Sequence, residues 1–186
     1  MNARETTYHG HLFRSRLEAR WAAFFDLMGW AWLYEPAVEL YNYIPDFILQ
    51  FYKPLLVEVK PEFTLDDLAK HADKIRLSGW DKEFLIVGAG LNPSSNKVAY
   101  GGLEGEIVIG LLHERFVDFR GVESWGEVGE GQIFRCDNCG KSSILHAVSS
   151  WHCRVCGFHG ANNIGLLWVD PIELWGEAHR LTRWTP

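Results

Sequence analysis

The segment from Tyr43 to Lys60, which reads YIPDFILQFYKPLLVEVK, constrains the fold of this chain more than any other. Its two apolar runs flank a short turn, a pattern typical of two adjacent β-strands. Side chains alternate between the faces of a strand, so Leu55, Val57 and Val59 lie on one face while Glu58 lies on the other. The apolar face predicts contact with a core. The other face presents a carboxylate beside the lysine that ends the segment.

Three charged side chains of this segment form a candidate site. Asp46 belongs to the first run, and Glu58 and Lys60 belong to the second. Two carboxylates and an ammonium group suit a hard divalent cation that activates water against a phosphodiester. Taken singly these residues carry little information, because an E-x-K pair is usually a solvated strand face and an aspartate after proline is commonly a turn residue.

The flanking segments predict a mixed α/β sheet covered by helices. Apolar residues recur at helical spacing between Phe13 and Met28, and Glu18 lies at the edge of this stripe. Thr64 is a suitable N-cap for a second helix that ends near Leu77. The strands are expected at about 40–49, 54–60 and 84–87. This order of helix, strand, strand, helix and strand requires at least one crossover, expected to be right-handed.

The second half of the chain predicts less regular structure before a final helix. Its glycine-rich stretches favour loops, and Asp170-Pro171 is a strong helix start. We expect a long surface loop over 88–105, a strand over 106–113, a linker over 121–131 and a last strand over 164–169.

Composition limits the class of protein. The chain has 186 residues, 47% hydrophobic and 23% charged, which is typical of one globular domain with room for a small appendage. Its net charge of −6 argues against binding to nucleic acid by bulk charge, although a local basic face would suffice. No apolar run approaches the ~20 residues of a membrane span, and the N-terminus has no signal-peptide pattern, so we expect a cytoplasmic protein without membrane contact.

The cysteines form the most specific local motif. Cys136 and Cys139, and again Cys153 and Cys156, form two C-x-x-C-G knuckles separated by thirteen residues. Two such knuckles complete a tetrahedral four-thiolate shell for a structural Zn²⁺ ion, with no open position for catalysis. A redox dithiol and a pair of disulfides are the alternatives, and a reducing compartment favours zinc. The nearby residues His146, His152 and His159 are expected at the surface or facing nucleic acid.

The motif residues resemble the PD-(D/E)xK nuclease superfamily. Pro45-Asp46 followed by Glu58-Val59-Lys60 matches its signature, and the segment YHGHLFRSRLEARWAAFFDLMGWAWLYEP resembles the opening of small phage and mobile-element members. The resemblance covers roughly residues 8–87. It implies a restriction-endonuclease-like fold, with a mixed central sheet flanked by helices, and hydrolysis of DNA by an enzyme that requires Mg²⁺ or Mn²⁺.

The resemblance also assigns roles to residues. Asp46 and Glu58 would bind the cation together with the carbonyl of Val59. Lys60 would position or activate the attacking water, and Glu18 would be the helix-borne acidic residue of the site. The corresponding division of the chain is a nuclease core over 1–120, a zinc ribbon over 132–160, and a C-terminal strand and helix over 164–186 that packs on the core.

DNA is the expected partner, and a homodimer and a protein partner for the ribbon stay open. Candidate DNA contacts are Arg14, Arg16, Arg20, Lys70, Lys74, Arg76, Arg135, Lys141, Arg154 and, by stacking, Trp151. A salt-bridged or solvated surface is the better expectation for any single one of the charged residues. The alternatives to a nuclease are a non-catalytic nucleic-acid-binding module and a regulatory protein whose ribbon docks a partner.

Overall fold

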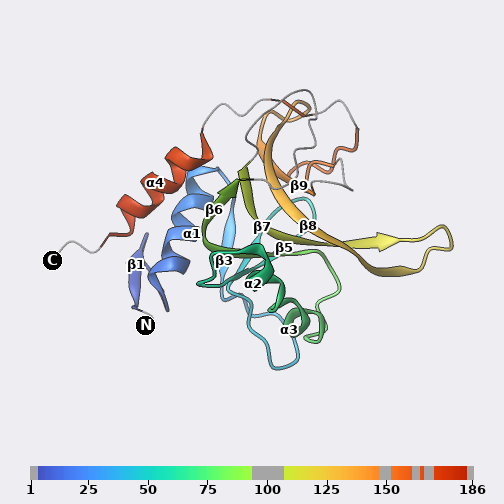
Figure 1. Cartoon of the computed structure of the whole chain (residues 1–186), viewed down its shortest axis with the longest axis horizontal. Coiled ribbons are helices and arrows are strands. Elements are labelled where there is room, and N and C mark those ends of the chain that lie inside the picture. The colour runs from blue at the N-terminus through green and yellow to red at the C-terminus, as the bar shows by residue number, and fades with distance from the viewer. Residues whose placement is uncertain (1–3, 94–106, 147–151, 161–163, 166–169, 184–186) are drawn as a thin grey trace.

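The computed structural model describes residues 4–93, 107–146, 152–160, 164–165 and 170–183, and it is a mixed α+β structure (Figure 1). One small hairpin and one large, mostly antiparallel sheet are present. The hairpin consists of β1 (Thr6–Tyr8) and β2 (His11–Phe13). The large sheet contains β3 (Trp32–Tyr34), β4 (Phe47–Leu49), β5 (Leu55–Val59), β6 (Phe84–Pro93), β7 (Ile107–Val117), β8 (Glu123–Cys136), β9 (Ser142–His146) and β10 (Ile164–Gly165). The helices are α1 (Arg16–Leu27), α2 (Leu65–Ala69), α3 (Ala72–Arg76) and α4 (Pro171–Leu181).

The order of the large sheet is β10-β8-β7-β6-β5-β4-β3, with β9 also paired to β8. Strands β5 and β6 are parallel, and the connection between them contains α2 and α3. This is the crossover that the order of elements predicts. The other pairs in the described part of the sheet are antiparallel.

Helix α1 begins at Arg16 because Ser15 is its N-cap. Ser15 has extended backbone angles, and its side chain accepts a hydrogen bond from the backbone N–H of Glu18. The predicted start at Phe13 is therefore slightly early, since Phe13 belongs to β2. Trp21 and Phe24 are fully buried in the main core, and α4 packs beside them through Trp175, whose ring centroid lies 4.4 Å from that of Trp21.

The second layer of the core lies on the opposite face of the sheet. It contains Leu68 of α2 and Ile75 of α3 together with Leu56 and Ile86 of the parallel strands. The predicted single helix over 64–77 is divided into α2 and α3, because the backbone N–H groups at 70 and 71 bond to carbonyls three residues back and tighten the turn. Strand β5 is thus covered on both faces, as is usual for a parallel pair.

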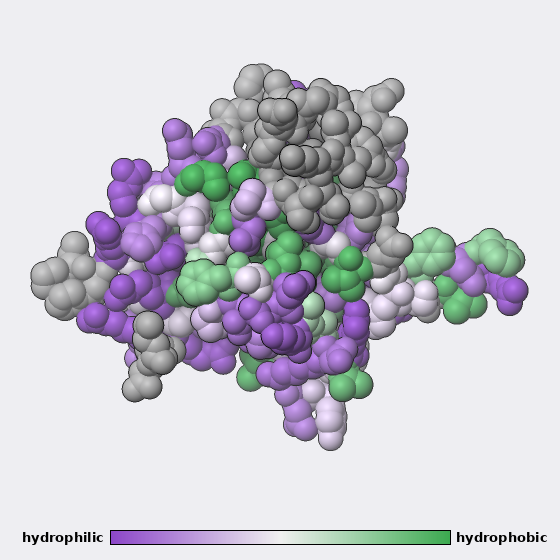
Figure 2. Space-filling view, in the orientation of Figure 1, coloured by the Kyte–Doolittle hydropathy of each residue, from purple (hydrophilic) through white to green (hydrophobic). Residues whose placement is uncertain are grey.

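The prediction of a linker over 121–131 is wrong. These residues lie mostly in β8, which pairs with β7 from Glu123 onward. The glycines of the segment allow close packing: a side chain at Gly129 would clash with the ring of His146, and one at Gly131 would press on Leu85 and Ile144. Beyond the body of the sheet, β7 and β8 form a projecting arm whose tip carries Phe119, 91% exposed (Figures 1 and 2).

Two other loop and strand predictions are met only in part. Strand β6 extends to Pro93, so the start of the expected loop over 88–105 is a strand, and the rest of that loop lies outside the described residues. Of the expected strand over 164–169, the structure describes β10, and the remaining residues lie outside the described part. The helix start at Asp170-Pro171 is confirmed.

Within the described residues, the helices are too short or too polar to cross a membrane.

Candidate functional site

The candidate site lies where β4 begins and β5 ends. Asp46 directly precedes β4, which runs antiparallel to β5 with Phe47 opposite Val57. The backbone N–H of Val59 donates a hydrogen bond to Oδ2 of Asp46 at 2.7 Å. The two strands therefore hold Asp46 beside the strand end that carries Glu58 and Lys60.

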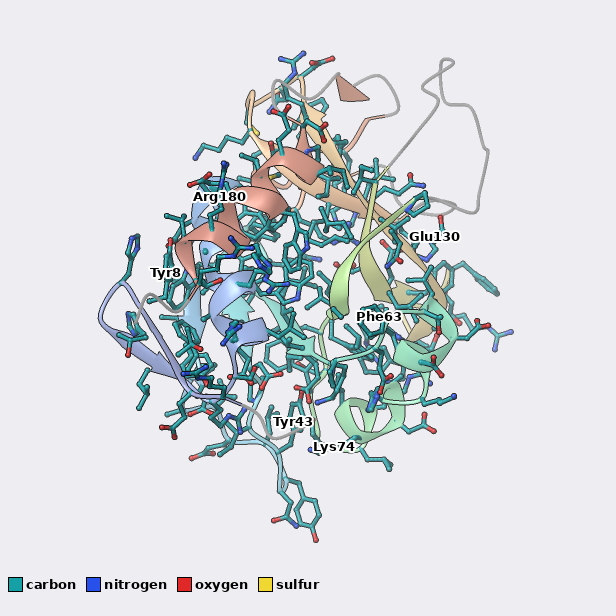
Figure 3. The ribbon with its side chains drawn as sticks, turned by 60° about the vertical axis from the view of Figure 1, so that its left-hand side comes forward. Tyr8, Tyr43, Phe63, Lys74, Glu130 and Arg180 are labelled. Atoms are coloured by element: carbon teal, nitrogen blue, oxygen red, sulfur yellow. The ribbon has the colours of Figure 1, made fainter. Side chains whose placement is uncertain are left out.

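Glu58 is almost completely buried and is held by two donors. Nζ of Lys60 lies 2.5 Å from its Oε1, and the hydroxyl of Tyr43 donates to its Oε2. Lys74 of α3 lies over the Tyr43 ring, 5.3 Å from its centroid, and Figure 3 labels both residues at this end of the molecule. Lys60 is partly exposed, so its ammonium group reaches from the buried carboxylate toward solvent.

Helix α1 brings Glu18 to the same site. The hydroxyl of Tyr34 donates to Oε2 of Glu18 at 2.6 Å, and the hydroxyl of Ser15 donates to Oε1 at 2.8 Å. Ser15 thus caps the helix and orients the carboxylate in one arrangement. The capping-box spacing Ser15-x-x-Glu18 could have revealed the role of Ser15 from the sequence, whereas no sequence signal points to Tyr34 or Tyr43.

The neighbouring carboxylates disfavour the charged form of Asp46. Burial, and then the charge of Glu58, raise the pKa of Asp46 to about 7, although the N–H of Val59 and the charge of Lys60 oppose this shift and Glu18 adds to it. Burial also raises the pKa of Tyr34, to about 12, as does its hydrogen bond to Glu18. Burial and the charge of Glu58 raise the pKa of Tyr43 as well, so the hydroxyls of Tyr34 and Tyr43 are both donors at neutral pH. A site of this kind gains stability from any positive charge that enters it.

Arg14 supplies such a charge in the structure. Its Nη2 lies 2.6 Å from Oδ1 of Asp46, its Nε lies 2.7 Å from Oε1 of Glu35, and Glu18 is 4.0 Å away. The sequence predicts Arg14 as a DNA contact, but the structure places it among the carboxylates. The Arg14 side chain is half exposed, whereas that of Asp46 is buried.

The residues present fit a divalent cation with few protein ligands. Asp46 and Glu58 offer carboxylate oxygens, which Mg²⁺ commonly combines with several waters. Glu18 belongs to the same site but does not form a closed cage with them. Within the described residues, the four cysteines form the only group of three or more His, Cys, Asp or Glu side chains whose ligand atoms all lie within 4.8 Å of one another.

The cysteine cluster has the geometry of a four-thiolate metal site. Sγ of Cys136 lies 3.9 Å from that of Cys156, and Sγ of Cys139 lies 3.9 Å from that of Cys153. Four sulfurs placed tetrahedrally at ~2.3 Å from zinc would be ~3.8 Å apart. In each knuckle the glycine, Gly140 or Gly157, has a positive φ and donates its N–H to the carbonyl of the first cysteine at 2.7 Å. The cluster is therefore compatible with structural zinc.

Several of the predicted contacts with nucleic acid form ion pairs within the protein. Arg154 is buried and pairs with Glu83 at 2.8 Å and Glu114 at 2.5 Å, so its prediction as a DNA contact is wrong. His146 is 1% exposed, so its prediction as a surface residue is also wrong. Lys70, Arg76 and Arg135 each pair with a nearby aspartate: Asp67, Asp73 and Asp137 respectively. Trp151 lies outside the described residues.

Comparison with family models, with curated proteins and with solved structures finds no match to this chain.

Proposed function

We propose that this protein is a metal-dependent DNA endonuclease of the PD-(D/E)xK type, with a restriction-endonuclease-like core. One observation carries the proposal: two buried carboxylates, Asp46 and Glu58, lie beside Lys60 at the ends of adjacent strands, and Glu18 approaches from a helix. Buried acidic side chains gathered at one place, among them Asp46 with its raised pKa, are typical of functional sites.

Asp46, Glu58 and the carbonyl of Val59 would hold Mg²⁺ or Mn²⁺. Such a cation supplies an activated water near neutral pH and stabilises charge on a phosphoryl oxygen. Lys60 adds a second positive charge at the partly exposed rim of the site, where a phosphate can approach. Hydrogen bonds from Ser15 and Tyr34 fix the orientation of Glu18, so its carboxylate is suited to bind or orient a water.

The cysteine cluster would serve stability and not hydrolysis. Four thiolates leave a zinc ion no open position, and Cys136 ends β8, which three strands separate from β4 in the order of the sheet. We therefore assign Zn²⁺ as the structural ion and Mg²⁺ or Mn²⁺ as the catalytic one.

A cleavage panel tests the proposal. Plasmid, linear duplex, single-stranded and four-way-junction DNA are incubated with Mg²⁺, Mn²⁺ or chelator, using wild type and Glu58→Gln. Glu62→Gln is a matched control, because Glu62 is a nearby carboxylate that pairs with His71. We expect cation-dependent cutting that is lost in Glu58→Gln and kept in Glu62→Gln. If no DNA form is cut while DNA still binds equally to both variants, the protein is a non-catalytic binding module.

A further inference from the structure

A cluster of positive side chains lies where the first turn of α1 meets the end of α4. Arg16 and Arg20 are one helical turn apart on α1, and His179 and Arg183 come from α4 and the residues after it. The end of α4 and the N-terminal hairpin enclose a cavity of about 370 Å³ beside them. The described lining contains three arginines (Arg4, Arg16 and Arg183), three threonines (Thr6, Thr7 and Thr182), Leu181 and one carboxylate, Glu5.

Within the described residues, no ion pair neutralises the arginines of this cluster. In the part of the chain that the structure describes, no ion pair joins Arg16, Arg20 or Arg183 to a carboxylate, whereas Arg180 on the same α4 helix pairs with Glu177. The Nε atom of Arg20 is buried without a hydrogen-bond partner among those residues. In a protein with a net charge of −6, such a concentration of unpaired positive charge is unexpected.

The like charges in the cluster disfavour one another. Burial and the charge of Arg16 lower the pKa of Arg20, and the charge of Arg20 is the largest cause that lowers the pKa of His179. Packing nevertheless holds the group in place, since the Arg20 guanidinium lies 5.4 Å from the centroid of the Trp175 ring. An anion would relieve this repulsion, and guanidinium groups bind phosphate oxygens in a planar, bidentate geometry.

The cluster and the carboxylate site lie at the same end of α1. Arg16 and Glu18 are two residues apart, a rise of ~3 Å along the axis, and they face different sides of a helix ~10 Å wide. Figure 3 shows α4, marked by Arg180, lying across α1, and hydrophilic residues cover this side of the molecule in Figure 2. At ~3.4 Å per nucleotide, a DNA strand spans that width in about three nucleotides.

We propose that Arg16, Arg20 and Arg183 bind backbone phosphates of the DNA strand a few nucleotides from the bond that the carboxylate site cleaves. The cluster would position the strand, and the threonine hydroxyls of the cavity could donate to the same phosphates. The position relative to the cleaved bond rests on the proposed function, whereas the phosphate-binding role does not.

Fluorescence anisotropy of a labelled duplex tests the proposal in a Glu58→Gln background, where cleavage does not interfere. We compare Arg16→Ala/Arg183→Ala with Arg180→Ala between 50 and 200 mM salt. Each phosphate contact contributes about −0.9 to the slope of log K against log salt. We expect the double variant to bind roughly tenfold more weakly at low salt, with a slope flatter by about 2. The Arg180→Ala variant should match its parent, because Glu177 already compensates that charge.

Further measurements keep the result decisive. Arg16→Lys/Arg183→Lys should retain most of the salt slope, and melting curves should show that the alanine variant is folded. If the alanine variant binds duplex with the parental affinity and slope, the proposal is overturned. Binding of the same variants to anionic phospholipid vesicles and to inorganic phosphate is measured in parallel. The proposal is equally overturned if the alanine variant loses binding to either of these while its binding to duplex is unchanged. Failure of wild type to cleave DNA would refute the nuclease but leave this binding result standing.

Discussion

At the scale of single residues, the proposed cation and Arg14 would compete for Asp46. A divalent cation and the Arg14 guanidinium would both lie against the same carboxylate, where Arg14 is 2.6 Å away. We therefore predict that Arg14→Gln binds Mn²⁺ about tenfold more tightly than wild type, because a like charge is removed from the site. Isothermal titration calorimetry measures this directly, with Arg180→Gln as a control for charge removed elsewhere. Unchanged or weaker Mn²⁺ binding would show that Arg14 does not compete.

Substitution of Lys60 should distinguish cation binding from turnover. Its ammonium group neutralises Glu58 but is no cation ligand, so Lys60→Ala should still bind Mn²⁺. Turnover should fall about 10³-fold, the usual effect of removing one charge-stabilising donor from an active site. Single-turnover cleavage and calorimetry on the same preparation give both quantities. Loss of Mn²⁺ binding in Lys60→Ala, but not in Lys60→Met, would assign the lysine a structural role instead.

His113 gives the protein a specific sensitivity to acid. It is buried against Phe84, and burial, Arg76 and His146 lower its pKa to about 3. In the unfolded chain its pKa is ~6.5, so between these values only the unfolded state binds the proton, and stability falls as the pH falls below 6.5. The free energy of unfolding should fall between pH 8 and pH 5 in wild type. We predict that this fall is about 2 kcal/mol smaller in His113→Phe. Urea denaturation of both proteins at the two pH values measures this. An equal fall in unfolding free energy for wild type and His113→Phe would contradict the prediction.

At the scale of elements, one buried arginine joins the second cysteine knuckle to the sheet. Arg154 pairs with Glu83 before β6 and with Glu114 of β7, and donates to the carbonyl of Ile144 in β9 at 2.6 Å. Arg154→Met should destabilise the protein by about 3–5 kcal/mol, because it removes a buried counter-charge from Glu83 and from Glu114. Arg135→Met, at the more exposed pair with Asp137, should cost less than about 1 kcal/mol. Equal urea midpoints for the two variants would refute this assignment.

The same elements show what the sequence can and cannot predict. The buried stripe of α1, the covered strand β5 and the two knuckles depend on residues close together in the chain, and each could be predicted. The role of Arg154 could not, because its partners lie 71 and 40 residues away. Strand β8 could not be predicted either, because its glycines favour a loop locally. They become strand residues only through pairing with β7 and close contact with His146.

At the scale of the molecule, the strands that lead to the cysteine cluster and the strands that carry the carboxylate site share one core. Ile133 of β8 and Ile144 of β9 belong to the same hydrophobic cluster as Phe24 and Trp30, and the indole N–H of Trp30 donates to the carbonyl of Ser142 at 2.8 Å. Loss of zinc should therefore weaken the whole protein and not release a separate unit, because contacts on both sides of the core would loosen together.

We predict that purified protein contains one zinc per chain and that Cys136→Ser/Cys153→Ser contains none, as elemental analysis can measure. The variant should melt several degrees lower in a single transition, with the same midpoint by circular dichroism and by tryptophan fluorescence. Below that transition it should still bind Mn²⁺, because the pairing of β4 with β5 and the N–H of Val59 hold Asp46 beside Glu58 without involving a cysteine. Two separate transitions would mean that the knuckles fold independently. Simultaneous loss of Mn²⁺ binding in a folded variant would mean that zinc shapes the carboxylate site itself.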